Sequence, residues 1–132
     1  MKLIYPAIFE PWDKGEGYTV TFPDLQGVAT EGETLADAML MAEDAASLWV
    51  LDEIEEGRPA PAASDRADVT APEGAFVNLV ALDIGVYAEK YGNKAIRKNV
   101  TIPAWLNAIA EKQQINYSFV LQEGLKGRLG IQ

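Results

Sequence analysis

Three side chains that can read DNA bases alternate along one short stretch of the sequence, at Arg97, Asn99 and Thr101. Alternate residues of a β-strand share one face, so a strand here would present all three side chains together. Arginine can bind guanine through two hydrogen bonds, asparagine can bind adenine in the same way, and threonine can contact base edges or a thymine methyl group. The stretch therefore predicts a strand whose polar face reads bases.

A second candidate feature lies at residues 116–118. Asn116 is a good helix N-cap, and the backbone amides near Asn116, Tyr117 and Ser118 would form an anion site suited to a DNA backbone phosphate. The alternative is that both groups of residues are ordinary polar side chains facing solvent.

Residues 96–125 must position these side chains. Ile96, Val100 and Ile102 would form the apolar face of the strand, and Pro103 would end it and begin a helix over 104–113, followed by a second helix over 117–125. The inward positions of these helices are Leu106, Ile109, Ala110, Val120, Leu121 and Leu125.

A unit of one strand and two short helices buries too little surface to be stable alone. We therefore expect two copies to pair their strands antiparallel, which gives a ribbon-helix-helix (β-α-α) homodimer. A two-stranded ribbon of this kind fits the major groove of DNA.

The charge of the chain reverses along its length. Residues 1–89 carry a net charge of −14 and residues 90–132 carry +5, within a total of −9 over 132 residues. An acidic surface repels nucleic acid and a basic surface attracts it. We therefore expect two domains with different partners, 1–89 and 90–132.

Residues 1–89 are predicted to form a sheet with one long helix, in the order β-β-β-α-β. The strands are expected at 2–9, 18–22, 28–31 and 75–82, and the helix runs from its N-cap Thr34 to about Glu56. Pro6 limits the first strand to an edge of the sheet or to the start of pairing. The loop over 58–74 is long and is expected to be either mobile or a binding loop.

The composition speaks against several enzyme classes. The chain has no cysteine and no histidine, so it lacks the usual general base, the commonest zinc ligand and any thiolate. Asp24 and Asp83 could serve a Mg²⁺-dependent nuclease, but nothing in their spacing directs them to one point. We expect a protein that is not an enzyme and uses no cofactor or metal. Because no apolar run is long enough to span a bilayer, we expect a cytoplasmic location.

Residues 3–46 resemble the N-terminal domain of HicB-type antitoxins. The resemblance lies in the blocks YPAIFEP (5–11), GYTVTFPDLQG (17–27) and ATEGETLADAMLMAEDA (29–45). Residues 96–127 are similar to ribbon-helix-helix repressors, a common C-terminal module of the same family. Lys98 departs from the family by replacing an aliphatic residue of the ribbon, and Gln114 by standing where a glycine is expected between the helices.

The resemblance implies a truncated RNase H-like domain without nuclease activity, which binds and masks a HicA-type toxin, a small basic mRNA interferase. It also implies a C-terminal homodimer, possibly part of a tetramer, that binds operator DNA through Arg97, Asn99 and Thr101 and represses its own operon. The alternative is a stand-alone ribbon-helix-helix regulator whose N-terminal domain binds another protein or a small ligand.

Overall fold

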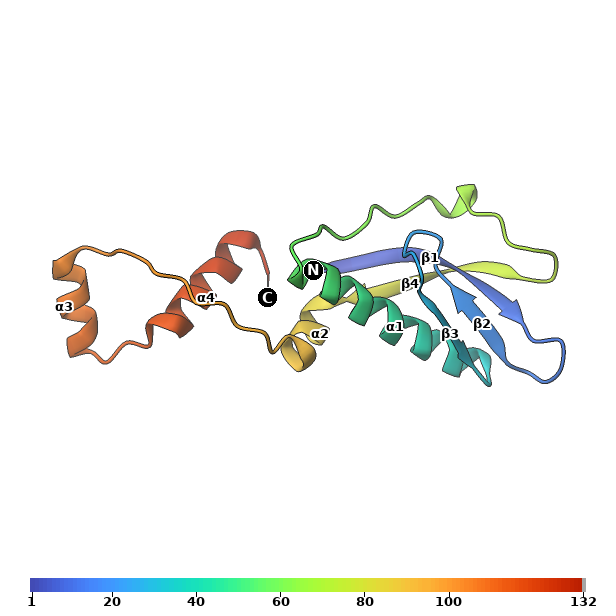
Figure 1. Cartoon of the computed structure of the whole chain (residues 1–132), viewed down its shortest axis with the longest axis horizontal. Coiled ribbons are helices and arrows are strands. Elements are labelled where there is room, and N and C mark those ends of the chain that lie inside the picture. Colours follow the sequence, from blue (N-terminus) through green and yellow to red (C-terminus); the bar gives the residue numbers. More distant parts are fainter. Residues whose placement is uncertain (132) are drawn as a thin grey trace. The chain divides into compact units, whose positions relative to one another are not determined.

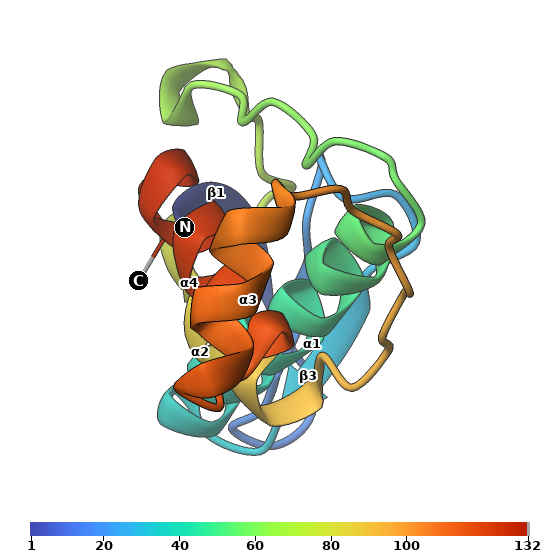
Figure 2. The ribbon, with the colours of Figure 1, turned by 90° about the vertical axis from the view of Figure 1, so that its left-hand side faces the viewer.

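The computed structural model of the chain describes residues 1–131, which form two compact units. The first unit comprises residues 1–93, and the second begins at Lys94 (Figures 1 and 2). Both strands and helices are present, so the expected α+β class is confirmed. Within residues 1–131, no helix has the length and apolar character needed to cross a membrane.

The first unit is built on a four-stranded antiparallel sheet with the strand order β3-β2-β1-β4. The strands span Lys2–Pro11 (β1), Tyr18–Thr21 (β2), Ala29–Gly32 (β3) and Phe76–Asp83 (β4). Helix α1 (Leu35–Glu55) separates β3 from β4 in the chain, so the predicted element order β-β-β-α-β is the observed one. The observed ends of these elements lie within a few residues of the predicted ones.

Pro6 was expected to limit β1 to an edge or to the start of pairing, and the edge alternative was wrong, because β1 lies between β2 and β4. Pro6 pairs with Leu79 of β4, whereas pairing with β2 begins only at Ile8. At Pro6 the strand therefore has a single neighbour, as it would at an edge. Proline has no N–H to donate, and it is tolerated there because no second strand needs that hydrogen bond.

Helix α1 packs on the sheet through small side chains at four-residue spacing. Ala38, Ala42 and Ala46 are completely buried. Gly32, the last residue of β3, is part of this close approach, because a Cβ atom there would lie 2.2 Å from the backbone nitrogen of Ala38. The helix can therefore contact β3 directly through backbone. The rest of the core consists of Tyr5, Ala7, Phe9, Val20, Phe22, Leu25, Val28, Val50, Leu51, Val80, Leu82 and Ile84.

Both ends of α1 are closed by hydrogen bonds. At the start, Thr34 Oγ1 accepts a hydrogen bond from the backbone N–H of Asp37 at 3.0 Å, so the predicted N-cap is confirmed. After the end, Gly57 turns the chain with a φ of +82°. The Arg58 guanidinium then donates two hydrogen bonds to the Glu53 carboxylate, at 2.7 and 2.8 Å. This pair offsets the unfavourable position of an acid at the negative end of the helix dipole.

The loop over 58–74 is fixed to the first unit at two points. The Tyr5 hydroxyl donates a hydrogen bond to the carbonyl oxygen of Pro61 at 2.6 Å. The backbone N–H and the hydroxyl of Ser64 donate to the Asp24 carboxylate at 2.9 and 2.6 Å. A single 3₁₀ turn at Arg66–Asp68 follows. These contacts hold the loop against the sheet domain.

Helix α2 (Ile84–Tyr91) follows β4 directly and packs against α1. Its N-cap is Asp83, whose Oδ1 accepts a hydrogen bond from the N–H of Val86 at 3.3 Å. The Tyr87 hydroxyl donates to Asp44 Oδ1 at 3.2 Å, which joins α2 to α1.

The second unit contains helices α3 (Ala104–Lys112) and α4 (Tyr117–Leu129), preceded by residues 94–103, which run without regular structure (Figure 1). The strand predicted over 96–102 is not formed within one chain. A strand is defined by hydrogen bonds to a neighbouring strand, and its predicted neighbour belongs to a second copy. The ribbon therefore stays a prediction.

The turn between α3 and α4 is a Schellman motif. The Ile115 N–H donates to the Ala110 carbonyl at 3.1 Å, and the Gln114 N–H donates to the Glu111 carbonyl at 3.0 Å. Gln114 takes the left-handed conformation that this motif requires, with a φ of +55°. The turn therefore forms without the glycine that is usual at this position.

Candidate nucleic-acid interface

The three predicted base-reading residues lie on the extended segment before α3. The side chains of Arg97, Asn99 and Thr101 are all exposed. Within residues 1–131 none of them makes a side-chain hydrogen bond or an ion pair. Their donors and acceptors are therefore available to a ligand.

Three of the four residues that alternate with them, all but Lys98, are apolar, and these three are exposed as well. Ile96 is 82% exposed and Val100 is 66% exposed, with Ile102 at 38%. Exposed apolar side chains of this size are unfavourable in water, at about 25 cal/mol for each Å² of apolar surface. This face of the segment therefore needs a partner.

The helices of the second unit have the same property, since neither α3 nor α4 contains a buried residue. So many exposed large apolar side chains in a unit of this size are unusual on a monomeric protein and indicate an interaction surface. Its exposed members are Trp105, Leu106, Ile109, Ile115, Tyr117, Phe119, Val120, Leu121, Leu125 and Leu129.

The predicted phosphate-binding residues lie at the start of α4. Asn116 is the N-cap, and its Oδ1 accepts a hydrogen bond from the N–H of Phe119 at 3.0 Å. The Tyr117 hydroxyl donates to Asn107 Oδ1 at 2.8 Å, which links α4 to α3. Ser118 is exposed. The side chains of Asn116 and Tyr117 thus have structural contacts, so an anion would meet the first-turn amides and the Ser118 hydroxyl.

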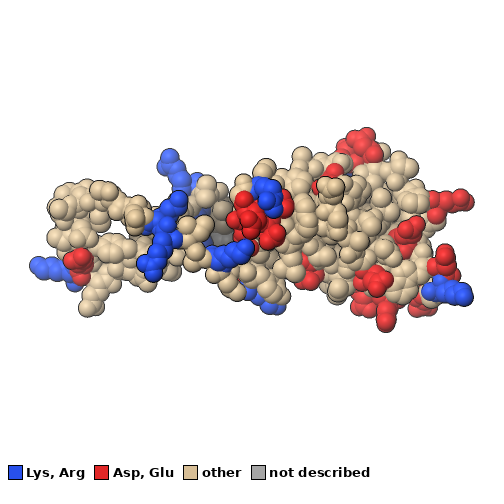
Figure 3. Space-filling model, in the orientation of Figure 1, with Lys and Arg blue, Asp and Glu red and all other residues tan. Residues whose placement is uncertain are grey.

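Charge divides between the two units as the sequence indicates. On the face drawn in Figure 3, acidic side chains gather over the first unit and basic side chains over the second. Acids of the second unit are Glu111 and Glu123, and Glu123 lies 3.8 Å from Lys126.

The two aspartates considered for a nuclease have other contacts. Asp24 accepts both hydrogen bonds from Ser64, and Asp83 caps α2. Asp24 therefore holds the 58–74 loop, and Asp83 caps the N-terminus of α2.

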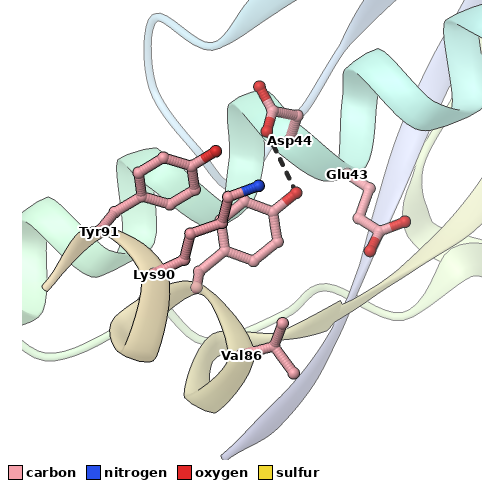
Figure 4. A pocket seen from close by; sticks show the side chains of 6 residues that line it. Glu43, Asp44, Val86, Lys90 and Tyr91 are labelled. Atoms are coloured by element: carbon pink, nitrogen blue, oxygen red, sulfur yellow. Dashed lines mark hydrogen bonds between the residues drawn. The ribbon is translucent and has the colours of Figure 1, made fainter.

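One feature of the first unit was missed by sequence reasoning. A pocket of about 240 Å³ lies between α1 and α2 and is lined by Glu43, Asp44, Val86, Tyr87, Lys90 and Tyr91 (Figure 4). Burial and the neighbouring Asp44 carboxylate raise the pKa of Tyr87 to about 12. The signal that could have indicated it is the pair of tyrosines four residues apart, which share one helix face.

Comparison with known proteins decides the family. Residues 5–122 match the family described as the HicB-like antitoxin of bacterial toxin–antitoxin systems. The chain belongs to this family. It is 36% identical over 69 residues to antitoxin HicB 1 of Photorhabdus laumondii, a match that covers 49% of this chain and 44% of that protein. It is also 29% identical over 105 residues to an uncharacterised 14.9 kDa protein of Haemophilus phage HP1, covering 79% of this chain and 76% of that protein.

Solved structures of this family have the same fold. A chain of a toxin–antitoxin complex from Streptococcus pneumoniae superposes with a TM-score of 0.62 at 26% identity, over 97% of this chain and 99% of that one. The Burkholderia pseudomallei antitoxin HicB gives a TM-score of 0.56 at 28% identity, over 95% and 98%. Membership of the HicB-like family supports an antitoxin role with a toxin as partner, and indicates a regulatory protein that is not catalytic.

Proposed function

We propose that this chain neutralises a HicA-type mRNA interferase through residues 1–89 and represses its own operon by binding operator DNA as a homodimer through residues 90–132. The observation that carries the proposal is membership of the HicB-like antitoxin family over residues 5–122. The protein acts in the cytoplasm, without a cofactor and without an enzymatic activity of its own.

Charge supports the division of labour. The −14 half of the chain suits a small basic toxin, and it disfavours binding of that half to nucleic acid. The order β-β-β-α-β from β1 to β4, which α2 follows in the first unit, is the order expected of a truncated RNase H-like domain.

The exposed apolar side chains of the second unit support dimerisation. If residues 96–102 of two copies pair antiparallel, Ile96, Val100 and Ile102 turn away from solvent, and α3 and α4 of both copies close over them. The opposite face of the ribbon then presents Arg97, Asn99 and Thr101 of both copies on an element that fits the major groove.

The start of α4 would hold the dimer on the DNA backbone. First-turn amides together with the positive end of the dipole of a 13-residue helix favour an anion, and a phosphate is the anion that flanks the groove. Residues Asn116, Tyr117 and Ser118 therefore position the ribbon, while the ribbon reads sequence.

Co-expression with the neighbouring reading frame tests the proposal, which requires that frame to encode a small basic protein. We expect that protein to arrest growth, and we expect both the full chain and residues 1–93 to relieve the arrest. Only the full chain should repress a reporter driven by the operon's promoter. A stand-alone regulator would repress the reporter and leave the arrest unchanged, which would contradict the antitoxin part.

A further inference from the structure

The pocket between α1 and α2 combines carboxylates with aromatic rings. Asp44 comes from α1, and Lys90 and Tyr91 come from α2; in Figure 4 the latter two lie on one side of Asp44 and Glu43 lies on the other. The ring of Tyr91 lies 5.8 Å from the ring of Tyr87, measured between centroids. Carboxylates beside aromatic faces are the surroundings that favour a cation.

The Glu43 and Asp44 carboxylates have few hydrogen-bond donors and no paired cation among the described residues of the first unit. Glu43 and Asp44 are half-buried, and within residues 1–131 neither of them forms an ion pair. Asp44 accepts one hydrogen bond, from the Tyr87 hydroxyl at a long 3.2 Å. A half-buried carboxylate with a single weak neutral donor is incompletely satisfied.

A buried hydroxyl without a partner lies behind the pocket. Ser47 is completely buried on α1, one turn after Glu43 and Asp44, and its Oγ has no hydrogen-bond partner in the described part of the chain. Within the described residues, α1 therefore carries an unpaired hydroxyl one turn from the incompletely paired Asp44 carboxylate.

Lys90 shows that the rings accept a positive charge. Its Nζ lies 5.4 Å from the centroid of the Tyr91 ring. This lysine is exposed and its side chain is flexible, so a cation from a partner could displace it.

Large apolar side chains flank the pocket along α1. Leu40 lies one turn before Asp44 and is 65% exposed, and Leu48 lies one turn after it and is 37% exposed. An apolar surface around a central charged anchor is the arrangement of a protein–protein hot spot.

We propose that this pocket binds an arginine side chain of the toxin, with Asp44 as its main carboxylate partner, Glu43 as a second one, and Leu40 and Leu48 as the apolar rim. The inference rests on the antitoxin function proposed above. An arginine fits better than a lysine because a planar guanidinium can donate two hydrogen bonds to a carboxylate while it stacks on a tyrosine ring.

Titration calorimetry of the full chain with the proposed toxin, the small basic protein expected from the neighbouring reading frame, tests this inference. The double variant Glu43→Gln/Asp44→Asn should bind at least about tenfold more weakly, because a desolvated arginine would lose its charged partners. The matched control Asp13→Asn/Glu16→Gln removes the same charge from the exposed β1–β2 turn and should change affinity less than about threefold.

Lys90 gives a second test of opposite sign. Lys90→Gln removes the internal competitor and should strengthen binding by more than the control Lys14→Gln, which removes an exposed lysine of the β1–β2 turn. Equal effects of pocket and control variants would show that only overall charge matters and would overturn the inference. Unchanged binding by the pocket variants would overturn it as well, while leaving the antitoxin function intact. Failure of the unaltered chain to bind would refute both.

Discussion

Replacement of Gln114 by glycine should stabilise the second unit. Gln114 holds a φ of +55° between α3 and α4. The left-handed conformation costs an ordinary residue roughly 1–2 kcal/mol and costs glycine almost nothing. The substitution also stabilises the unfolded chain by about 0.4–1 kcal/mol, because glycine gives that chain more conformational entropy, and this offsets part of the gain. The net gain is about 0.5–1 kcal/mol for each chain.

In a homodimer the gain counts twice. About 1–2 kcal/mol for each dimer corresponds to a factor of about 5–30 in the unfolding equilibrium. Two copies of residues 94–132 fall in the size range where 1 kcal/mol shifts the melting temperature by about 4–8 °C. Urea and thermal unfolding of the full chain, at several protein concentrations, would measure both quantities.

The control is Gln113→Gly, one residue earlier. Gln113 is the C-cap of α3 and has a φ of −90°, so glycine relieves no strain there and should only destabilise. If Gln114→Gly destabilised the protein as much as Gln113→Gly does, the left-handed turn between α3 and α4 would be wrong. If the melting temperature did not depend on protein concentration, the second unit would not unfold together with a dimer interface.

Three further predictions concern other parts of the chain. Arg97→Ala should weaken operator binding by about 1–3 kcal/mol in a gel-shift titration and relax base preference at one position of each half-site, and unchanged affinity of an Arg97→Ala/Asn99→Ala double variant would exclude the ribbon as the reading element. Gly32→Ala should destabilise the first unit by more than about 2 kcal/mol in urea unfolding, because the new Cβ would meet the backbone of Ala38, and a neutral effect would contradict that close contact. The raised pKa of Tyr87, about 12 against an ordinary 10.0, means that the unfolded chain loses this proton first, so stability should fall as pH rises from about 10 to about 12. Tyr87→Phe should remove that part of the decline, and identical pH profiles for the two proteins would refute it.

The first unit was predictable from sequence where local signals agree. The alternation of Tyr18, Val20 and Phe22 and the capping threonine at 34 each specify one element, and both elements form. The edge position expected of β1 from Pro6 was wrong, because proline requires only that one side of the strand be unpaired at that residue. The rest of the strand can still have two neighbours, as β1 does from Ile8 onward. Strand order is set by contacts between distant residues, and single-residue preferences do not contain it.

The candidate sites differ in the same way. Arg97, Asn99 and Thr101 could be chosen from alternation within seven residues, and the structure leaves all three exposed. The pocket joins Asp44 to Tyr91, which lie far apart in the chain and meet only because α2 packs on α1. The contact between α1 and α2 depends on residues far apart in the chain, so no local sequence pattern predicts it.

The central claim is that the first unit masks a toxin, and it is tested most directly by measuring RNA cleavage. The neighbouring reading frame should encode a small basic protein that cuts mRNA in vitro, and increasing amounts of the full chain should reduce cleavage to background near one chain for each toxin molecule. Cleavage that persists with this chain in large excess would contradict the account.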